Sequence, residues 1–223
     1  MASDTPLLPK RLLIPWAIFL ALAVVATLGV GVQRADYVTP FALAGMYGLV
    51  AGAELLVLLV VTPLASGEGQ GVGTPAVVLL WAMAAPVVVV AWWVSDVDAA
   101  SVAASQGYLL AVALGVAGYL RADRGGRFRS WYWLLVGLLG AGVPVAAFVV
   151  GDHLRSQLTW LYALSPFWVL ARIAGPWQFG WDWAAPFAGV ICIATALWLV
   201  SRIPPLLPPS RLHQPDEDVF ERW

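Results

Sequence analysis

Charge, cysteine and histidine are scarce in this chain, and each scarcity excludes a class of protein. Charged residues are 11% of the 223 positions, whereas a soluble domain carries about a quarter. The single cysteine, Cys192, excludes an internal disulfide and any multi-cysteine metal or iron–sulfur site. A formal net charge of −1 gives no overall basic character with which to bind nucleic acid.

Long apolar runs are what the chain has in abundance. Hydrophobic residues are 61% of the sequence, more than one soluble core of this size can hide, so lipid is the expected solvent. Six runs approach the roughly 20 residues that cross the hydrocarbon layer. They cover about 12–32, 39–61, 75–94, 102–120, 131–150 and 183–200. We therefore predict an all-α, polytopic membrane protein with six transmembrane helices in 1–203, followed by a proline-rich, acidic cytoplasmic tail in 204–223.

The basic residues fall on alternate connections, which predicts the orientation. With the N-terminus inside, nine of the twelve basic residues lie on the cytoplasmic side. They are Lys10, Arg11, Arg121, Arg124, Arg127, Arg129, Arg202, Arg211 and Arg222. The outer segments carry Arg34, Arg155 and Arg172. The positive-inside rule therefore predicts that both termini are cytoplasmic. The loop containing Arg121, Arg124, Arg127 and Arg129 sets this topology in one interpretation and docks a partner in another.

This topology and the absence of familiar motifs argue against an enzyme. The two histidines, His153 and His213, fall on opposite sides of the membrane and so do not share a metal or haem. The sequence has no HExxH, no GxSxG and no phosphate-binding glycine loop. We expect no catalytic residue, no metal site and no cofactor.

The connection between the fifth and sixth runs, 152–182, is apolar and carries helix punctuation. Ser165 and Pro166 are typical of an N-cap and a first helical residue, and glycine and proline at 175–176 end the short helix that follows. Asp152 is suited to cap an earlier piece over 153–163. We predict a re-entrant or interfacial hairpin on the outer side, which acts either as a packing cap or as a gate that includes Trp168 and Arg172.

Glu54 is the one ionisable residue deep in a run, and its charged form would cost about 3 kcal/mol there. Such a carboxyl is a candidate for lining a transport path, or else it hydrogen-bonds to a neighbouring helix. The sequence provides no intramembrane Lys, Arg or His as its partner. Gly48 and Gly52 on the same run are spaced for close helix contact. Their spacing predicts a packing helix and gives weak support for a dimer.

The chain resembles the membrane subunits of type-2 ABC transporters, the exporter permeases. The resemblance covers the six-span layout, the segment LSPFWVLARI (164–173) between the last two spans, and VTPLASGEGQGVGT (61–74) after the second. It implies a permease subunit in the bacterial cytoplasmic membrane that works as a dimer or pseudo-dimer with a separate ATPase subunit. The chain departs from the family in lacking a long segment before its first span and in having a glycine-rich first cytoplasmic loop.

Other functions stay open beside the exporter. A non-catalytic scaffold or accessory subunit of a larger membrane complex fits the small loops and the lone Glu54. A small secondary transporter is a weaker alternative, because neither an inverted repeat nor a pair of broken helices is visible.

Overall fold

The protein is described from a computed structural model, which covers residues 10–33, 40–65, 74–95, 97–123, 128–154, 162, 164–174, 189–191, 193–195 and 198. Every regular element in these ranges is helical. The helices are α1 (Lys10–Gln33), α2 (Pro40–Leu56), η1 (Val57–Val61), α3 (Thr62–Ala65), α4 (Thr74–Met83), α5 (Ala85–Ser95), α6 (Ala99–Ala122), α7 (Arg129–Gly137), η2 (Leu138–Gly142), α8 (Val143–Leu154) and α9 (Pro166–Ala174).

Five helical stretches in the described part are long and apolar enough to cross a membrane. They are Arg11–Gly29, Gly45–Leu64, Thr74–Ser95, Ala99–Ala122 and Arg129–Val150. The all-helical prediction is confirmed for the described residues. The five stretches are compatible with a multi-pass membrane protein and coincide with the first five predicted spans.

Many large apolar side chains lie on the outer surface of the bundle. Trp93 is 81% exposed, Leu49 71% and Val25 68%. Large aliphatic and aromatic side chains with this much exposure are stable in lipid and not in water.

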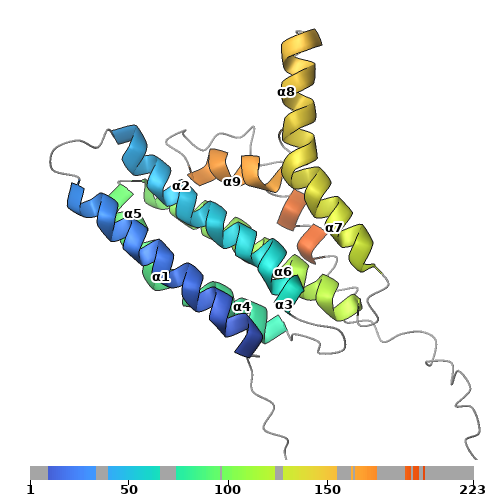
Figure 1. Cartoon of the computed structure of the whole chain (residues 1–223), viewed down its shortest axis with the longest axis horizontal. Coiled ribbons are helices and arrows are strands. Elements are labelled where there is room, and N and C mark those ends of the chain that lie inside the picture. Colours follow the sequence, from blue (N-terminus) through green and yellow to red (C-terminus); the bar gives the residue numbers. More distant parts are fainter. Residues whose placement is uncertain are drawn as a thin grey trace, which may run out of the picture.

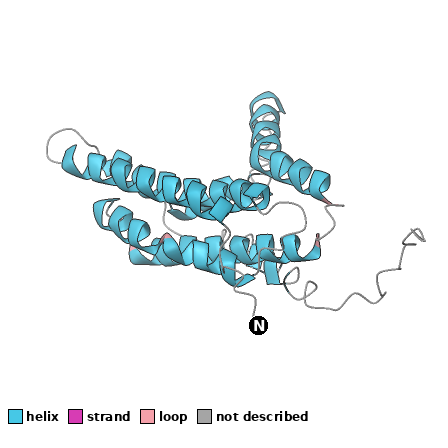
Figure 2. Ribbon diagram, turned by 60° about the horizontal axis from the view of Figure 1, so that its bottom comes forward, coloured by secondary structure: helices cyan, strands magenta, loops and turns pink. Residues whose placement is uncertain are grey.

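Figures 1 and 2 show the helices stacked in two layers, with the α7–η2–α8 helix bending away at one end. Helix α2 lies at the centre, because it contacts α1, α5, α6 and α9. The buried cluster follows these contacts and includes Trp16, Tyr47, Leu58 and Tyr108. By contrast, only 6% of the Arg129–Val150 span is buried.

Prolines account for the irregular points of three spans. A π-helical turn, η1, precedes Pro63, a break at Ala84 precedes Pro86, and a second π-helical turn, η2, precedes Pro144. Proline has no N–H and crowds the preceding turn, so the helix widens or breaks there instead of continuing regularly. The bend visible between α7 and α8 in Figure 1 lies at η2.

Two predicted helix boundaries were wrong, one at Pro63 and the other at Asp152. The second span does not end before Pro63, since the helix continues through it to Ala65. Nor does Asp152 start a new helix, because it lies within α8, which extends to Leu154. The π-helical turn η1 accommodates Pro63 within the helix. At Asp152, the apolar helix α8 continues past Val150 to Leu154.

Helix α6 begins three residues before the predicted start of the fourth span, because Asp98 caps it. The Asp98 carboxylate accepts hydrogen bonds from the Ser101 N–H at 2.8 Å and the Ser101 hydroxyl at 2.6 Å. These hydrogen bonds lower the pKa of Asp98. Asp98 is exposed at the end of the span.

The predicted sixth span is described only in part. Residues 189–191, 193–195 and 198 are helical. Ala194 is buried against α6, where a Cβ added to Gly115 would lie 3.5 Å from the Ala194 Cβ. The acidic tail and the loop 66–73 lie outside the described residues.

Candidate functional site

Glu54 lies on α2 inside the bundle and is 0% exposed. Its Oε2 accepts a hydrogen bond from Gln106 Nε2 of α6 at 3.4 Å. Its other oxygen, Oε1, is buried and has no hydrogen-bond partner in the described part of the chain. The sequence-based interpretation that Glu54 bonds to a neighbouring helix thus holds for one oxygen and leaves the other unsatisfied.

The Glu54–Gln106 contact belongs to a larger polar network between α2 and α6. Tyr47 lies seven residues before Glu54, so both project from the same face of α2. The Tyr47 hydroxyl is 2.6 Å from the Ser105 hydroxyl. The Gln106 side chain also forms a hydrogen-bonding contact with the Tyr47 hydroxyl. Both Tyr47 and Ser105 are 0% exposed.

The direction of the hydrogen bonds in this network follows from counting protons. Ser105 has one hydroxyl proton and donates it to the Val102 carbonyl at 2.9 Å. Tyr47 is therefore the donor in its bond with Ser105. Gln106 contributes amide protons to the Glu54 side, so Glu54 Oε2 serves as an acceptor.

Sequence analysis found Glu54 but not its partners. Ser105 and Gln106 are polar residues in an otherwise apolar run, and this departure was the available signal. A search limited to Lys, Arg and His as partners overlooks them, although an amide is sufficient to bond a carboxyl group.

The space around Gly48 and Gly52 is open within the described part. A Cβ added at either position would meet no atom within 4 Å. The prediction that they pack against another helix or a second copy stays untested.

The short helix predicted after Ser165 is present with the expected ends. Helix α9 runs Pro166–Ala174, and the Ser165 hydroxyl accepts a hydrogen bond from the Trp168 N–H at 3.4 Å. Trp168 stacks on Tyr162 with ring centroids 4.4 Å apart. Arg172 is half-buried in the last turn. The side chain of Asp152 and the piece predicted over 155–161 lie outside the described residues.

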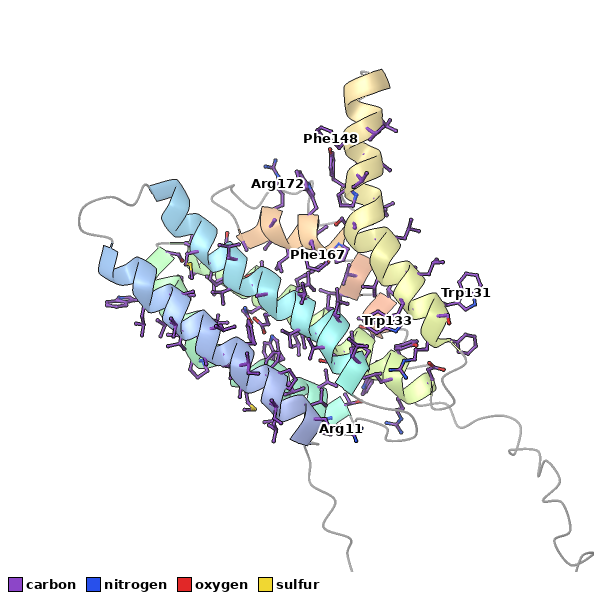
Figure 3. All side chains as sticks on the ribbon, viewed as in Figure 1. Arg11, Trp131, Trp133, Phe148, Phe167 and Arg172 are labelled. Atoms are coloured by element: carbon purple, nitrogen blue, oxygen red, sulfur yellow. The ribbon has the colours of Figure 1, made fainter. Side chains whose placement is uncertain are left out.

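Helix α9 is inserted among the spanning helices. It contacts α2 and α6, and Val169, Leu170 and Ile173 are each 1% exposed. The Tyr108 hydroxyl of α6 donates to the Pro166 carbonyl at 3.4 Å. Figure 3 shows Phe167 directed toward the bent fifth span, α7–η2–α8. A Cβ added to Gly140 in η2 would lie 3.3 Å from the Phe167 ring.

The arginine loop lies between the end of α6 and the start of α7. Arg121 is in the last turn of α6 and Arg129 is the first residue of α7, and both are half-buried, whereas Arg124 and Arg127 lie outside the described residues. The Asp123 carboxylate connects the two ends of the loop. It accepts hydrogen bonds from the Tyr119 hydroxyl at 2.8 Å and from the Phe128 N–H at 3.1 Å.

A tyrosine connects this end to the second span. Tyr132 stacks on Tyr119 at 4.4 Å between ring centroids, and its hydroxyl donates to the Leu59 carbonyl at 2.6 Å. In a regular helix the N–H of residue 63 would bond that carbonyl, but residue 63 is proline. Tyr132 therefore replaces a main-chain donor that Pro63 lacks.

Among the described residues, no group of three or more His, Cys, Asp or Glu side chains could hold a metal ion. Searches of protein-family models, curated proteins and solved structures gave no match to this chain.

Proposed function

We propose that the chain is the membrane-embedded permease subunit of an ABC-type exporter and works with a separate ATPase subunit. In this proposal it has six spans with both termini cytoplasmic, lies in the bacterial inner membrane, and carries a re-entrant hairpin on the outer side. The observation that carries the proposal is α9, which combines a sequence typical of such permeases with a position against α2 and α6.

Two features of α9 support a gating role. Its first turn reaches the Tyr108 hydroxyl, nine residues into α6, and its Phe167 ring meets Gly140 on another span. A short helix that is held by two different spans moves when either span moves. The buried face of α9 is apolar, and apolar packing on the spans is non-directional, which allows small sliding movements.

The inner arginine loop is the proposed docking surface for the ATPase. Arg121, Arg124, Arg127 and Arg129 concentrate positive charge in ten residues. The bond from Tyr132 to Leu59 links this loop with the second span, on which Glu54 lies. A movement of the loop is therefore transmitted through α7 and Tyr132 to the second span.

Affinity purification of the full chain in mild detergent, with mass spectrometry of the bound proteins, tests the proposal. We expect a stoichiometric ATPase subunit, and we expect Arg124→Glu combined with Arg127→Glu to lose it. Arg211→Glu combined with Arg222→Glu reverses the same number of charges in the tail and should retain the ATPase. Recovery of the unaltered chain without any ATPase contradicts the proposal.

A non-catalytic scaffold or accessory subunit is the second candidate function. Glu54 has no exposed surface, so it can line a transport path only if α2 and α6 separate. The fifth span is almost entirely exposed, which suits a subunit that packs an apolar surface against other membrane proteins. Co-purification with a larger complex that lacks an ATPase favours this alternative.

A further inference from the structure

The open oxygen of Glu54 identifies a site that neither the transport nor the scaffold function requires. Every other polar side-chain atom that links Tyr47, Ser105 and Gln106 to Glu54 has a partner in the network, whereas Oε1 is buried without one. A buried polar atom without a partner in a native protein needs an explanation, such as a bound ion, a water molecule or an altered protonation state of the carboxyl.

The surroundings of Glu54 decide which of these the carboxyl takes. Helix α5, which packs on α2, contains no ionisable residue. Lys10 and Arg11 lie at the first turn of α1, and Arg121 lies in the last turn of α6. No ion pair to Glu54 is present among the described residues.

Three further ionisable residues lie on elements that pack against α2, namely Arg172, Tyr108 and Tyr119. The Tyr119 hydroxyl donates to Asp123 near the end of α6. Arg172 is in the last turn of α9, and in Figure 3 its side chain points away from the α1–α2 side of the bundle. Tyr108 directs its hydroxyl to Pro166. Tyr47, on α2 itself, donates to Ser105. None of these groups supplies a positive charge to Glu54.

A carboxylate in this position would keep its charge with a single, long amide hydrogen bond. Without a cation beside it, such a charge is strongly disfavoured in a low-dielectric interior. A neutral acid needs no counter-charge. Because Oε2 already accepts from Gln106, the acid proton belongs on Oε1.

We propose that Glu54 is a proton-binding site, neutral at neutral pH, which carries its proton on Oε1 while Gln106 positions the carboxyl through Oε2. The proton comes from bulk water before α2 and α6 pack. The packed helices then keep the carboxyl out of contact with water. The proposal concerns Glu54 alone and does not depend on the proposed exporter function.

Infrared spectroscopy of the purified full chain at neutral pH tests this directly, because a neutral carboxylic acid has a carbonyl stretching band that a carboxylate lacks. We expect this band in the unaltered protein, and we expect it to shift when glutamate side chains are labelled with ¹³C. Glu54→Gln should abolish it. Glu68→Gln, a matched change in the glycine-rich loop, should leave it in place.

Gln106→Leu tests the role of Gln106. Loss of its amide donor should move the band to higher frequency without removing it, because the carbonyl oxygen then has no hydrogen bond. Absence of the band at neutral pH overturns the proposal, as does a band that survives Glu54→Gln. An unshifted band in Gln106→Leu overturns the positioning role. If Glu54→Gln does not fold, the isotope-labelled protein alone decides whether a neutral glutamate is present.

Discussion

At the residue scale, the bond between Tyr132 and the Leu59 carbonyl is a test of how membrane helices accommodate proline. Tyr132→Phe removes only the hydroxyl and, with it, the hydrogen bond to the Leu59 carbonyl. We expect a loss of about 1 kcal/mol of unfolding free energy, measured by titration with denaturing detergent.

The matched background for this change is Pro63→Ala. Alanine restores the N–H that a regular helix directs to Leu59, so Tyr132→Phe should cost clearly less in that background. Equal costs in the two backgrounds would show that the hydroxyl does not compensate for the proline.

Asp98 provides a pH-dependent contribution to stability at the same scale. Its pKa is lowered in the folded protein by its hydrogen bonds to Ser101. A carboxyl whose folded pKa is depressed stabilises the protein above the unfolded pKa and loses that effect as the pH falls through the folded pKa. Thermal stability should therefore decline in acid more steeply in the unaltered protein than in Asp98→Asn.

The exposure of Asp98 keeps this effect small. Asp98→Ala should cost about 1 kcal/mol at neutral pH through loss of the cap. Identical acid profiles for the unaltered protein and Asp98→Asn would contradict the linkage to this residue.

At the element scale, the contact between α9 and the fifth span depends on one missing side chain. A Cβ at Gly140 would lie 3.3 Å from the Phe167 ring, whereas one at Gly137 would meet nothing within 4 Å. Gly140→Ala should therefore destabilise the protein by about 1 kcal/mol through overpacking.

Gly137→Ala is the control for the helix itself. It should be neutral or stabilising by up to about 1 kcal/mol, since alanine favours the helix and nothing obstructs it. Thermal unfolding in one detergent compares the two variants. A Gly140→Ala variant as stable as Gly137→Ala would mean that α9 does not pack tightly on the fifth span.

Helix α9 also shows which elements a sequence reveals. Ser165, Pro166 and the glycine and proline after Ala174 punctuate it locally, so both its ends were predicted correctly. The π-helical turns were not predicted, because the response of a helix to proline depends on neighbours. Tyr132, the neighbour that satisfies the Leu59 carbonyl, is 73 positions away.

At the scale of the whole molecule, the predicted orientation is accessible to labelling. In a Cys192→Ser background, a cysteine at position 36 should react with a membrane-impermeant reagent added outside intact cells. A cysteine at position 126 should react only after the membrane is opened. The reverse pattern would contradict the assignment of cytoplasmic termini.

The composition of the chain was sufficient to predict a helical membrane protein, but not how its helices meet. Apolar surface covers every side of these helices, so the sequence carries little information on which side faces a neighbour. The Glu54–Gln106 pair was missed for this reason. Each residue is visible in its own run, but only the packing of α2 on α6 brings them together.

The Pro63 site also has a consequence for the order in which the protein is built. The second span leaves the ribosome well before the fifth, since Tyr132 follows Leu59 by 73 residues. During that interval the Leu59 carbonyl lacks both the Tyr132 hydroxyl and the N–H that residue 63 would donate in a regular helix. The irregular turn before Pro63 therefore gains this hydrogen bond only when the fifth span arrives, so the second span is less stable in the unfinished chain than in the finished protein.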